Sequence, residues 1–366
     1  MPEVPRSADP RSAGTARRPA SDLTFEASGA PPAGELAAWL DRAGASCTPP
    51  LHIERIPGGR SNLTFRVTDA AGRRWVVRRP PLTSALPSAH DVGREYRVMA
   101  ALRNSPVPVP TVIGEGEAAD ETPYYVMDYV EGVVLATAED VTNHLPVTSR
   151  TPLARKFVEK LARLHQLDPV SVGLEGLGRG VDFLERQLGR WHRQWRLLER
   201  EQPEIEQVHR AIEGRVPAQR AVVIVHGDYR LDNAIIDPAQ EAVSAVVDWE
   251  LCTLGEPLVD FAITLAYWSE PGDEVVPLGD APTLAAGMPS REQLVAWYEQ
   301  AAGRPIADLA TYLAFAYWRL AVVLEGIDAR ARAGAYGEAD MAMTWDLDVR
   351  VAWLLERAVE HLNRPR

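Results

Sequence analysis

The residues of this chain that are most able to do chemistry lie in two short runs. Residues 226–233 read HGDYRLDN, and fifteen residues after Asn233 comes the triplet DWE, which begins at Asp248. Phosphoryl transfer needs a carboxylate to receive the proton of an acceptor hydroxyl. It also needs an amide and a carboxylate to hold magnesium against the phosphates. Asp228, Asn233 and Asp248 supply these three groups.

Three short apolar strands must position these side chains. We expect strands at 221–225, 234–236 and 243–247, with a turn between the last two. Because the polar residues fall at strand ends, they converge on one face in this arrangement. The alternative is an Asx-capped turn and an ordinary strand terminus without chemistry. The spacing of the set favours the site.

A second region of interest precedes these runs. Alternating apolar residues predict strands at 53–56, 62–68, 74–79, 109–114 and 123–129, and helical spacing predicts a helix at 90–103. Gly58 and Gly59 lie in the turn after the first strand, where missing Cβ atoms let backbone N–H groups approach phosphates. Ser61 and Asn62 would add polar contacts to the β- and γ-phosphates. Alone, such a glycine pair indicates only a turn; the downstream set and the local charge favour a phosphate-binding loop.

The charge along the chain is uneven. Residues 51–105 carry ten arginines and four carboxylates, whereas residues 106–366 carry 24 basic and 41 acidic residues. This asymmetry predicts two lobes with different partners. Residues 1–21 are rich in Pro, Ala, Ser and Arg and predict a disordered tail. Helices are expected at 35–43, 152–166, 181–200, 203–213, 257–268, 290–302, 308–332 and 343–362.

Taken together, the motifs resemble those of the aminoglycoside phosphotransferase and choline kinase-like superfamily, whose fold is related to that of protein kinases. Three fragments resemble most the branch that is sometimes fused to acyl-CoA dehydrogenases: GGRSNLTF at 58–65, VVRRPP at 76–81 and GREYR at 93–97. The resemblance runs from about residue 50 to at least 330. It implies a two-lobed α+β fold. A nucleotide-binding N-lobe at 22–129 would hold a five-stranded antiparallel sheet and one helix, and a mainly helical C-lobe at 130–366 would hold the catalytic loop and the substrate-binding helices.

The resemblance also implies roles for individual residues in an ATP- and Mg²⁺-dependent kinase. Asp228 would be the catalytic base, and Asn233 and Asp248 the magnesium ligands. At the hinge between the lobes, backbone groups of Asp128, Tyr129 and Val130 would bind adenine. His226 and Asp260 are expected to brace the catalytic loop, and His165 to be a structural helix residue.

The kinase fold expects a lysine on the third strand, which holds the α- and β-phosphates and pairs with a glutamate of the following helix. This chain has 37 arginines and only two lysines, Lys156 and Lys160, both outside that strand. Strand alternation puts Arg78 and Arg79 on opposite faces. We predict Arg78 as the replacement, with Glu95 as its partner and Arg79 as the second choice.

Arg230 follows the predicted base by two residues, where protein kinases carry a lysine that contacts the transferred phosphate. It would stabilise the charge of that phosphate, and we place it with Asp228 in the catalytic set. The alternative is a bond to Asp232 or Asp260 that only braces the loop. The sequence leaves both interpretations open.

Composition excludes several classes of protein. The net charge of −12 argues against a general grip on nucleic acid or an anionic membrane. The longest apolar stretch, 312–324, is shorter than a bilayer-spanning helix and is interpreted as a core helix. Two cysteines form no disulfide framework and show no metal-ligand spacing. We therefore expect a cytoplasmic protein, and the resemblance implies that its partner is a small-molecule alcohol.

The acceptor is less constrained than the reaction. The resembled branch suggests a hydroxyacyl-CoA or hydroxy acid and a functional link to an acyl-CoA dehydrogenase. The acidic large lobe also fits an aminoglycoside or another amino-alcohol. The missing lysine keeps a third hypothesis open, a nucleotide-binding pseudokinase. An acyl-CoA dehydrogenase itself is not expected, because the chain lacks a flavin-type helical domain. Aromatic residues after 257 would line the acceptor cleft or pack in the core.

Overall fold

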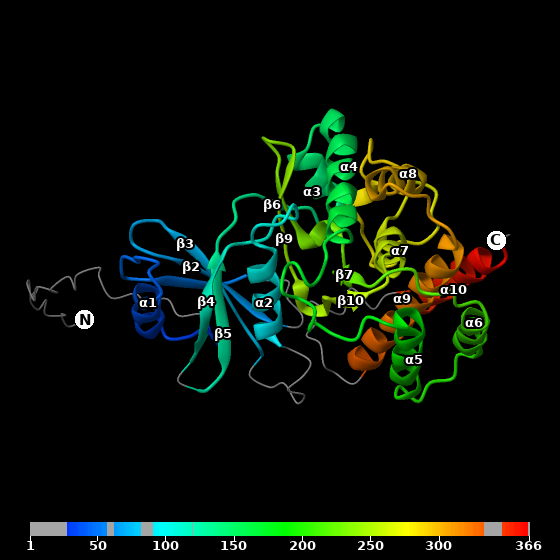
Figure 1. Cartoon of the computed structure of the whole chain (residues 1–366), viewed down its shortest axis with the longest axis horizontal. Coiled ribbons are helices and arrows are strands. Elements are labelled where there is room, and N and C mark those ends of the chain that lie inside the picture. Colours follow the sequence, from blue (N-terminus) through cyan, green and yellow to red (C-terminus); the bar gives the residue numbers. More distant parts are fainter. Residues whose placement is uncertain (1–27, 57–61, 82–90, 119, 333–345, 365–366) are drawn as a thin grey trace, which may run out of the picture.

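The computed structural model describes residues 28–56, 62–81, 91–118, 120–332 and 346–364. A small lobe built on a β-sheet lies beside a larger, mainly helical lobe (Figure 1). The predicted α+β class is confirmed, with a five-stranded antiparallel sheet in the small lobe. The predicted tail at 1–21 and the loop residues Gly58, Gly59 and Ser61 lie outside the described residues.

The sheet of the small lobe has the strand order β1-β2-β3-β5-β4. Its strands are β1 (His52–Arg55), β2 (Leu63–Thr68), β3 (Arg74–Arg79), β4 (Val112–Glu117) and β5 (Pro123–Asp128). Helix α1 (Ala33–Arg42) packs on one face, and helix α2 (Val92–Leu102) lies between the sheet and the large lobe (Figure 1). Strand β4 runs three residues beyond its predicted end, because glycines that look like a turn signal, Gly114 and Gly116, pair with β5.

Strand β3 divides its side chains between the two faces of the sheet. Val76 joins the core that continues into α2 and the large lobe, whereas Val77 joins the core under α1. The same alternation sends Arg78 toward α2 and Arg79 toward the opposite face. Strand geometry therefore decides which arginine faces the interlobe region.

Short strands at the base of the large lobe carry the HGDYRLDN and DWE runs. Strands β8 (Ala234–Asp237) and β9 (Ala242–Val246) pair across the predicted turn. Strand β7 (Val223–Val225) pairs instead with β10 (Thr253–Gly255) in a separate sheet. Strands β6 (Val133–Val134), which pairs with β8, and β10 were not predicted, because two or three residues show no alternation.

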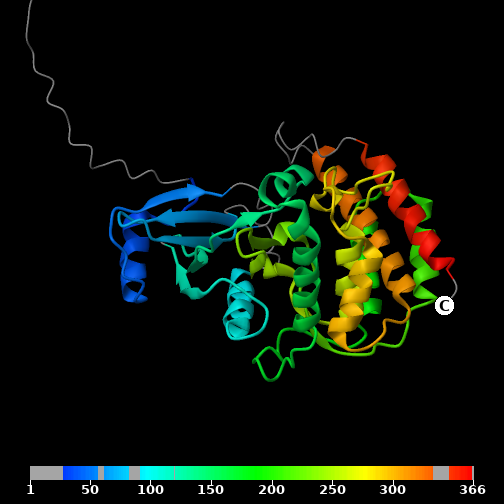
Figure 2. The same ribbon diagram turned by 90° about the horizontal axis from the view of Figure 1, so that it is seen from above.

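The other helices build the large lobe. They are α3 (Ala138–His144), α4 (Val147–Leu164), α5 (Phe183–Arg196), α6 (Pro203–Glu213), α7 (Pro257–Tyr267), α8 (Arg291–Ala302), α9 (Leu309–Arg332) and α10 (Leu347–Leu362). Only α3 lacks a predicted counterpart; its first turn is fixed by a capping box between Thr137 and Asp140. Helices α9 and α10 lie side by side at the end farthest from the sheet (Figures 1 and 2).

Helix α9 packs against four other helices of this lobe, α5, α6, α7 and α10. Its length and composition would allow it to cross a membrane, but 83% of its apolar window is buried inside the protein. Tyr312, Phe315, Tyr317 and Trp318 are all fully buried. These aromatic side chains therefore belong to the core and not to an acceptor cleft, which decides between the two roles considered for them.

An aromatic pair ties the HGDYRLDN run to helix α4. The rings of Phe157 and Tyr229 stack with centroids 4.3 Å apart. The Tyr229 hydroxyl donates to the Phe157 carbonyl at 2.8 Å, and Thr264 on α7 donates to the Tyr229 carbonyl at 2.9 Å. The middle of the run is thus fixed from two helices.

We expect Phe157→Ala to lower the free energy of unfolding by about 3 to 5 kcal/mol, because it removes a fully buried ring and leaves a cavity beside Tyr229. Urea denaturation followed by circular dichroism measures the loss. Leu197→Ala is the control, since Leu197 is 81% exposed and should lose less than about 0.5 kcal/mol. Similar losses in the two variants would contradict the anchoring role of Phe157.

Candidate active site

A buried carboxylate holds the start of the HGDYRLDN run. Asp260, in the first turn of α7, accepts the backbone N–H groups of His226 at 2.6 Å and Gly227 at 2.8 Å. It also contacts the His165 ring at 3.1 Å. Burial raises the pKa of Asp260, but the hydrogen bond and charge of His165 and the field of His226 outweigh it and leave the pKa below its usual value. Asp260 thus holds the loop backbone, as predicted, and His165, predicted only as a structural helix residue, contacts that carboxylate.

His226 also acts within the loop. Its Nε2 contacts the carbonyl of Val247 at 3.0 Å, and its Nδ1 accepts the backbone N–H of Asp228 at 3.2 Å. Both bonds are satisfied by a neutral ring protonated on Nε2. The next residue, Gly227, has φ +87° and lies so close to Leu251 that a Cβ would fall 2.8 Å from its side chain. Glycine is therefore required where the chain turns toward Asp228.

The predicted base and the two predicted magnesium ligands lie on neighbouring segments. Asn233 donates its side-chain amide to the carbonyl of Asp228 at 2.9 Å and to its carboxylate at 3.2 Å. The carbonyl of Asn233 accepts the N–H of Val247 at 2.9 Å, directly before Asp248. Asp228 and Asp248 are partly accessible, with 21% and 31% of their side chains exposed. The fold therefore brings the three predicted residues to one edge of the β8–β9 pair.

Arg78 bridges the two lobes. Its Nε lies 3.1 Å from the Glu95 carboxylate on α2, and its Nη2 lies 2.5 Å from that of Asp248. Arg79 points to the other face, where it donates to Asp120 at 2.7 Å and to the Gly29 carbonyl at 3.1 Å. Of the two arginines considered, the structure brings Arg78 to Glu95.

Glu95 is 1% exposed and receives two further bonds. Asn62 donates its amide to Oε1 at 2.6 Å, and the Tyr125 hydroxyl donates to Oε2 at 3.0 Å. Burial raises the pKa of Glu95, while the positive charge of Arg78 opposes that rise. Burial alone would lower the pKa of Arg78, and its negative surroundings, including Glu95 and Asp248, raise it instead. The arginine is therefore a permanent cation in this group.

The position of Asn62 differs from the prediction. Its side chain is buried and its amide nitrogen binds Glu95, so it supports the glutamate and does not reach outward as a phosphate contact. No local pattern predicts this contact, because the two residues lie 33 positions apart. Tyr125, which completes the group, was interpreted only as part of a strand.

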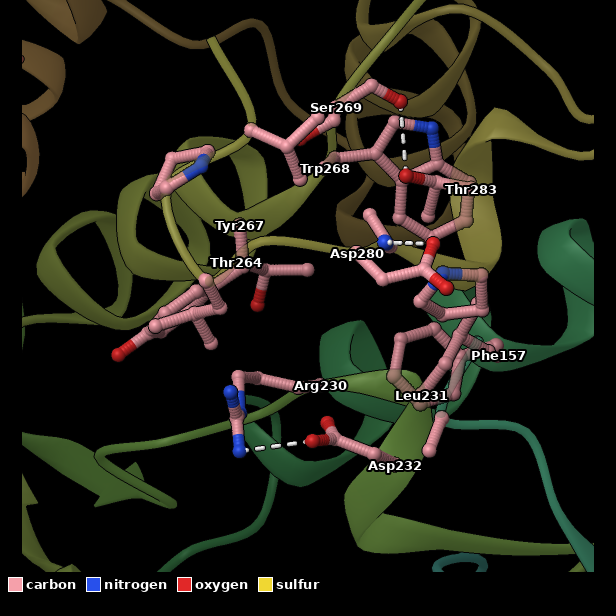
Figure 3. A pocket seen from close by; sticks show the side chains of 16 residues that line it. Phe157, Arg230, Leu231, Asp232, Thr264, Tyr267, Trp268, Ser269, Asp280 and Thr283 are labelled. Carbon is pink, nitrogen blue, oxygen red and sulfur yellow. Dashed lines mark hydrogen bonds and ion pairs between the residues drawn. The ribbon is translucent and has the colours of Figure 1, made fainter. Parts of the chain in front are cut away.

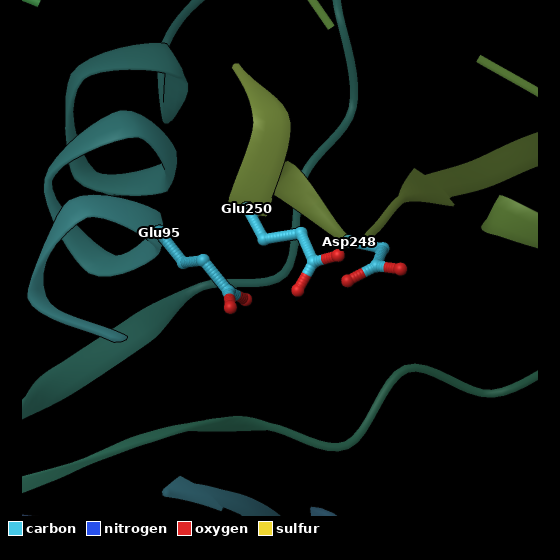
Figure 4. A group of neighbouring side chains, drawn as sticks. All are labelled: Glu95, Asp248 and Glu250. Carbon is cyan, nitrogen blue, oxygen red and sulfur yellow. The ribbon is translucent and has the colours of Figure 1, made fainter. Parts of the chain in front are cut away.

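Figure 4 shows the acidic side of this group. The carboxylates of Glu95, Asp248 and Glu250 each offer an oxygen atom within 4.8 Å of the other two. The guanidinium of Arg78 already contacts Glu95 and Asp248. Among the described residues, oxygen donors for a divalent cation are therefore found both here and at Asn233.

Arg230 lies against the predicted base. Its Nε is 3.4 Å from the Asp228 carboxylate, its Nη2 is 2.8 Å from Asp232, and its guanidinium stacks 4.7 Å from the centre of the Tyr267 ring. It does not bind Asp260, which corrects one partner considered from the sequence. Asp260 already serves the loop backbone and His165. The guanidinium is thus next to the atom that would receive the hydroxyl proton.

A small cavity of about 40 Å³, open to solvent, begins at Arg230 and Asp232 (Figure 3). Its walls are largely apolar. They include Phe157, Leu231, Tyr267, Trp268, Val276, Pro277 and Leu278, and Asp280 adds a carboxylate. The Asp280 carboxylate accepts the N–H of Ala281 at 2.6 Å. Of the aromatic residues considered for a cleft, Tyr267 and Trp268 thus line one.

The predicted hinge departs from expectation in its hydrogen bonds. The N–H of Asp128 donates to the Thr111 carbonyl at 2.8 Å, and that of Tyr129 donates to the Arg74 carbonyl at 3.3 Å. Both N–H groups are therefore used in bonds to segments beside β5, so they do not face an adenine ring. Among these three residues, only the N–H of Val130 makes no backbone hydrogen bond within the described chain.

The chain is similar to known proteins over most of its length. The model of the family described as "Phosphotransferase enzyme family" matches residues 52–294. Mouse acyl-CoA dehydrogenase family member 10 is 32% identical over 317 residues, which are 85% of this chain and 29% of that protein. Human acyl-CoA dehydrogenase family member 11 is 31% identical over 300 residues, 80% of this chain and 38% of that protein. The chain thus spans well under half of these relatives.

Solved structures show the same fold. A Ralstonia eutropha protein provisionally assigned as an aminoglycoside phosphotransferase is 30% identical, with a TM-score of 0.74, and the match covers 89% of this chain and 98% of that one. Macrolide 2′-phosphotransferase type I is 23% identical, with a TM-score of 0.56 over 88% of this chain and 96% of that one. The latter comparison bears on the fold alone.

We expect Arg78→Gln to destabilise the protein more at pH 8 than at pH 5. The variant leaves Glu95 buried beside Asp248 without its cation, and removing one partner of such a pair costs about 3 to 5 kcal/mol. Because the pKa of Glu95 is raised, the folded protein holds this proton more tightly than the unfolded chain does. The cost of the ionised carboxylate is therefore present above the folded pKa and disappears as the pH falls through it. Urea denaturation at both pH values measures the difference.

Arg79→Gln is the matched control for this experiment. It removes the neighbouring arginine, whose partner Asp120 is half-exposed, and the Arg79 bond lowers the pKa of that carboxyl. A lowered pKa confers its stability above the unfolded value, so this variant should lose the same amount at pH 5 and pH 8. A pH-independent loss for Arg78→Gln as well would show that Glu95 does not ionise against Arg78.

Proposed function

Since the chain belongs to the phosphotransferase enzyme family, we propose that it is an ATP- and Mg²⁺-dependent kinase that phosphorylates a hydroxyl of a small molecule, a hydroxy acid or hydroxyacyl-CoA. The observation that carries the proposal is the placement of Asp228. Its carboxylate is partly exposed, contacts both Asn233 and Arg230, and lies one residue from the Tyr229 anchor. No other described carboxylate combines these neighbours.

The loop residues have distinct parts in the transfer. The Asp228 carboxylate accepts the proton of the acceptor hydroxyl, the hydroxyl oxygen forms a bond to the γ-phosphorus of ATP, and the bond from that phosphorus to the bridging oxygen of ADP breaks, so that ADP leaves. Arg230 lies beside the Asp228 carboxylate and stabilises negative charge on the transferred phosphoryl group. Asp232 holds the other end of the guanidinium at 2.8 Å. The bracing and catalytic interpretations of Arg230 are thus compatible. The ion pair with Asp232 orients the guanidinium, and the same guanidinium then stabilises the transferred phosphoryl group.

The residues present fit a magnesium ion. The Asn233 amide directs its nitrogen to Asp228, which leaves its oxygen as a ligand atom, and Asp248 offers a partly exposed carboxylate. Magnesium prefers such oxygen donors together with phosphate oxygens and water. When bound, it would neutralise charge on the β- and γ-phosphates. Asn233 and Asp248 would hold it.

The interlobe groups fit a nucleotide. Arg78 offers a permanent charge for the α- and β-phosphates, positioned by Glu95, and arginine forks bind phosphate well. The N–H of Val130 is the hinge donor best placed for adenine, with Asp128 and Tyr129 supplying the backbone around it. Structures of the fold with bound nucleotide support this assignment: APH(4)-Ia with ADP and hygromycin B, and aminoglycoside 2′-phosphotransferase-IIIa with GDP.

The acceptor class rests on the relatives and on the cavity. The relatives named as acyl-CoA dehydrogenases extend well beyond the matched region, which supports a functional link to such an enzyme. The apolar wall of Phe157, Leu231 and Trp268 suits an aliphatic portion of an acceptor. We propose a cytoplasmic location as well, and the free thiols of Cys47 and Cys252 agree with it.

Two other functions keep specific support. Asp232 and Asp280 at the cavity suit an amino-alcohol, and solved neighbours are aminoglycoside phosphotransferases. A pseudokinase is favoured by the arginine in place of lysine. The intact set of Asp228, Asn233 and Asp248 argues against it, because a protein that only binds nucleotide has no need of the base.

We expect Asp228→Asn to reduce ADP release in the presence of an acceptor by about 10²- to 10⁴-fold, with little change in ATP affinity, because the base is lost while the phosphate contacts remain. A panel of hydroxy acids, hydroxyacyl-CoA thioesters and amino-alcohols, coupled to an ADP assay, measures both the loss and the acceptor class. Asp237→Asn is the control, since asparagine keeps the Asx turn between β8 and β9. Full activity of Asp228→Asn would remove the proposed base, and wild-type binding of ATP without transfer to any acceptor or water would favour the pseudokinase.

A further inference from the structure

Two arginines from different helices share one indole ring outside the groups described above. The guanidinium of Arg319, on α9, lies 4.9 Å from the centre of the Trp191 ring, and that of Arg190, on α5, lies 5.9 Å from it. The two residues are 129 positions apart, so the fold and not local sequence brings them together. Like charges are gathered here against an aromatic face.

Arg319 is nearly buried, with 7% of the residue exposed, yet its contacts leave most of its donors free. Its Nη2 donates to the carbonyl of Gly227 at 3.3 Å. No carboxylate among the described residues forms an ion pair with Arg319 or Arg190. By contrast, Arg78, Arg200 and Arg291 each bind two carboxylates. A largely buried guanidinium that keeps free N–H donors and has no carboxylate partner is suited to bind an anion.

A third arginine adds charge from the small lobe. Arg94, on α2, donates to the carbonyls of Cys252 and Leu177, at 2.6 Å and 2.9 Å. These bonds hold it across the lobe boundary but do not neutralise it. Although Arg190 is exposed, partial desolvation by the surrounding protein lowers its pKa, and the positive charges of Arg319 and Arg94 lower it further. Arg190 therefore lies within the electrostatic reach of both other arginines.

We propose that Arg94, Arg190 and Arg319 form an anion-binding site that holds a carboxylate or phosphate group of the acceptor. Guanidinium groups bind both anions through paired N–H donors, and the Trp191 ring holds two of the three in place. Arg319 touches the residue directly before Asp228. An acceptor anchored here would extend its hydroxyl toward the base.

This inference rests on the proposed function and narrows its acceptor. The phosphates of the nucleotide have Arg78 and the metal ligands in the proposed function, so this second cationic site serves a different anion. An acceptor that carries negative charge fits it: the carboxylate of a free hydroxy acid, or a phosphate of its CoA thioester. A polycationic sugar does not fit, because three uncompensated arginines would repel its amines.

Binding is tested first, since it needs no turnover. Isothermal titration of the full chain with inorganic phosphate, in the presence of a saturating non-hydrolysable ATP analogue, compares the wild type with Arg190→Gln and Arg319→Gln. We expect each variant to bind phosphate about ten-fold more weakly. Arg193→Gln, an exposed arginine on the same helix, is the matched control and should bind as the wild type does. Because Arg190 is exposed, we expect Arg190→Gln to fold normally. This variant therefore still tests the site if Arg319→Gln fails to fold.

Kinetics then connect the site to the acceptor. For one hydroxy acid, its primary amide and its CoA thioester, we expect Arg190→Gln to raise KM about ten-fold for the charged acceptor that uses the site. The values of kcat and the ATP KM should stay within about two-fold, and the amide should be unaffected. Which charged acceptor responds separates a carboxylate from a CoA phosphate.

Two failures have different meanings. Phosphate affinity and acceptor KM that are both unchanged in Arg190→Gln and Arg319→Gln would overturn the anion site, even if ADP release is normal. If no acceptor supports ADP release but phosphate binding still depends on these arginines, the kinase proposal falls and the anion-binding site stands. Equal weakening by Arg193→Gln would show that α5 attracts anions only through its overall charge and would also overturn the proposal.

Discussion

The contact on which the site depends is the double ion pair of Arg78, because one side chain joins three structural units. It comes from strand β3, binds Glu95 on helix α2 and binds Asp248 at the end of β9. This cation between two carboxylates therefore links the sheet, the helix and the large lobe, and Arg94 adds a second link through its bonds to the Cys252 and Leu177 carbonyls. Such a pair, mostly removed from water, adds little net stability but strongly disfavours arrangements that leave one charge alone. It thus acts mainly as a specifier of geometry.

The large lobe has its own counterpart in Asp260. That carboxylate uses both oxygens on the backbone of the HGDYRLDN run, at His226 and Gly227. Since the Val247 carbonyl is tied to His226 and the Val247 N–H to Asn233, a displacement of the run would also move Asp248. Asp260 and Arg78 are therefore coupled through the short strands between them. Two largely buried charges therefore hold the geometry of the site: Arg78, which comes from the small lobe, and Asp260, which comes from the large lobe.

How much of this could be predicted depends on the distance over which a contact acts. Alternation along β3 separated Arg78 from Arg79, because strand geometry is local. The spacing of Asp228, Asn233 and Asp248 predicted that they lie close together, because side chains at neighbouring strand ends converge. Three other features could not be predicted, because each depends on how distant segments pack. They are the contact of Asn62 with Glu95, the hydrogen bonds of the Asp128 and Tyr129 N–H groups, and the shared position of Arg190 and Arg319 on one indole ring. The candidate site residues could thus be predicted from the sequence, whereas the residues that position them could be identified only from the tertiary structure.

The distribution of charge gives the arginines of the large lobe a separate meaning. Residues 106–366 carry 41 acidic and 24 basic residues, so the surroundings of Arg190 and Arg319 are acidic overall. In such a lobe an arginine easily finds a carboxylate, as Arg200 does with Glu325 and Asp328. That Arg190 and Arg319 meet an indole ring and a carbonyl instead is therefore not explained by composition. The position of Arg319 next to Gly227, with Arg190 on the same indole ring, is explained if the missing counter-ion arrives with the molecule on which Asp228 acts.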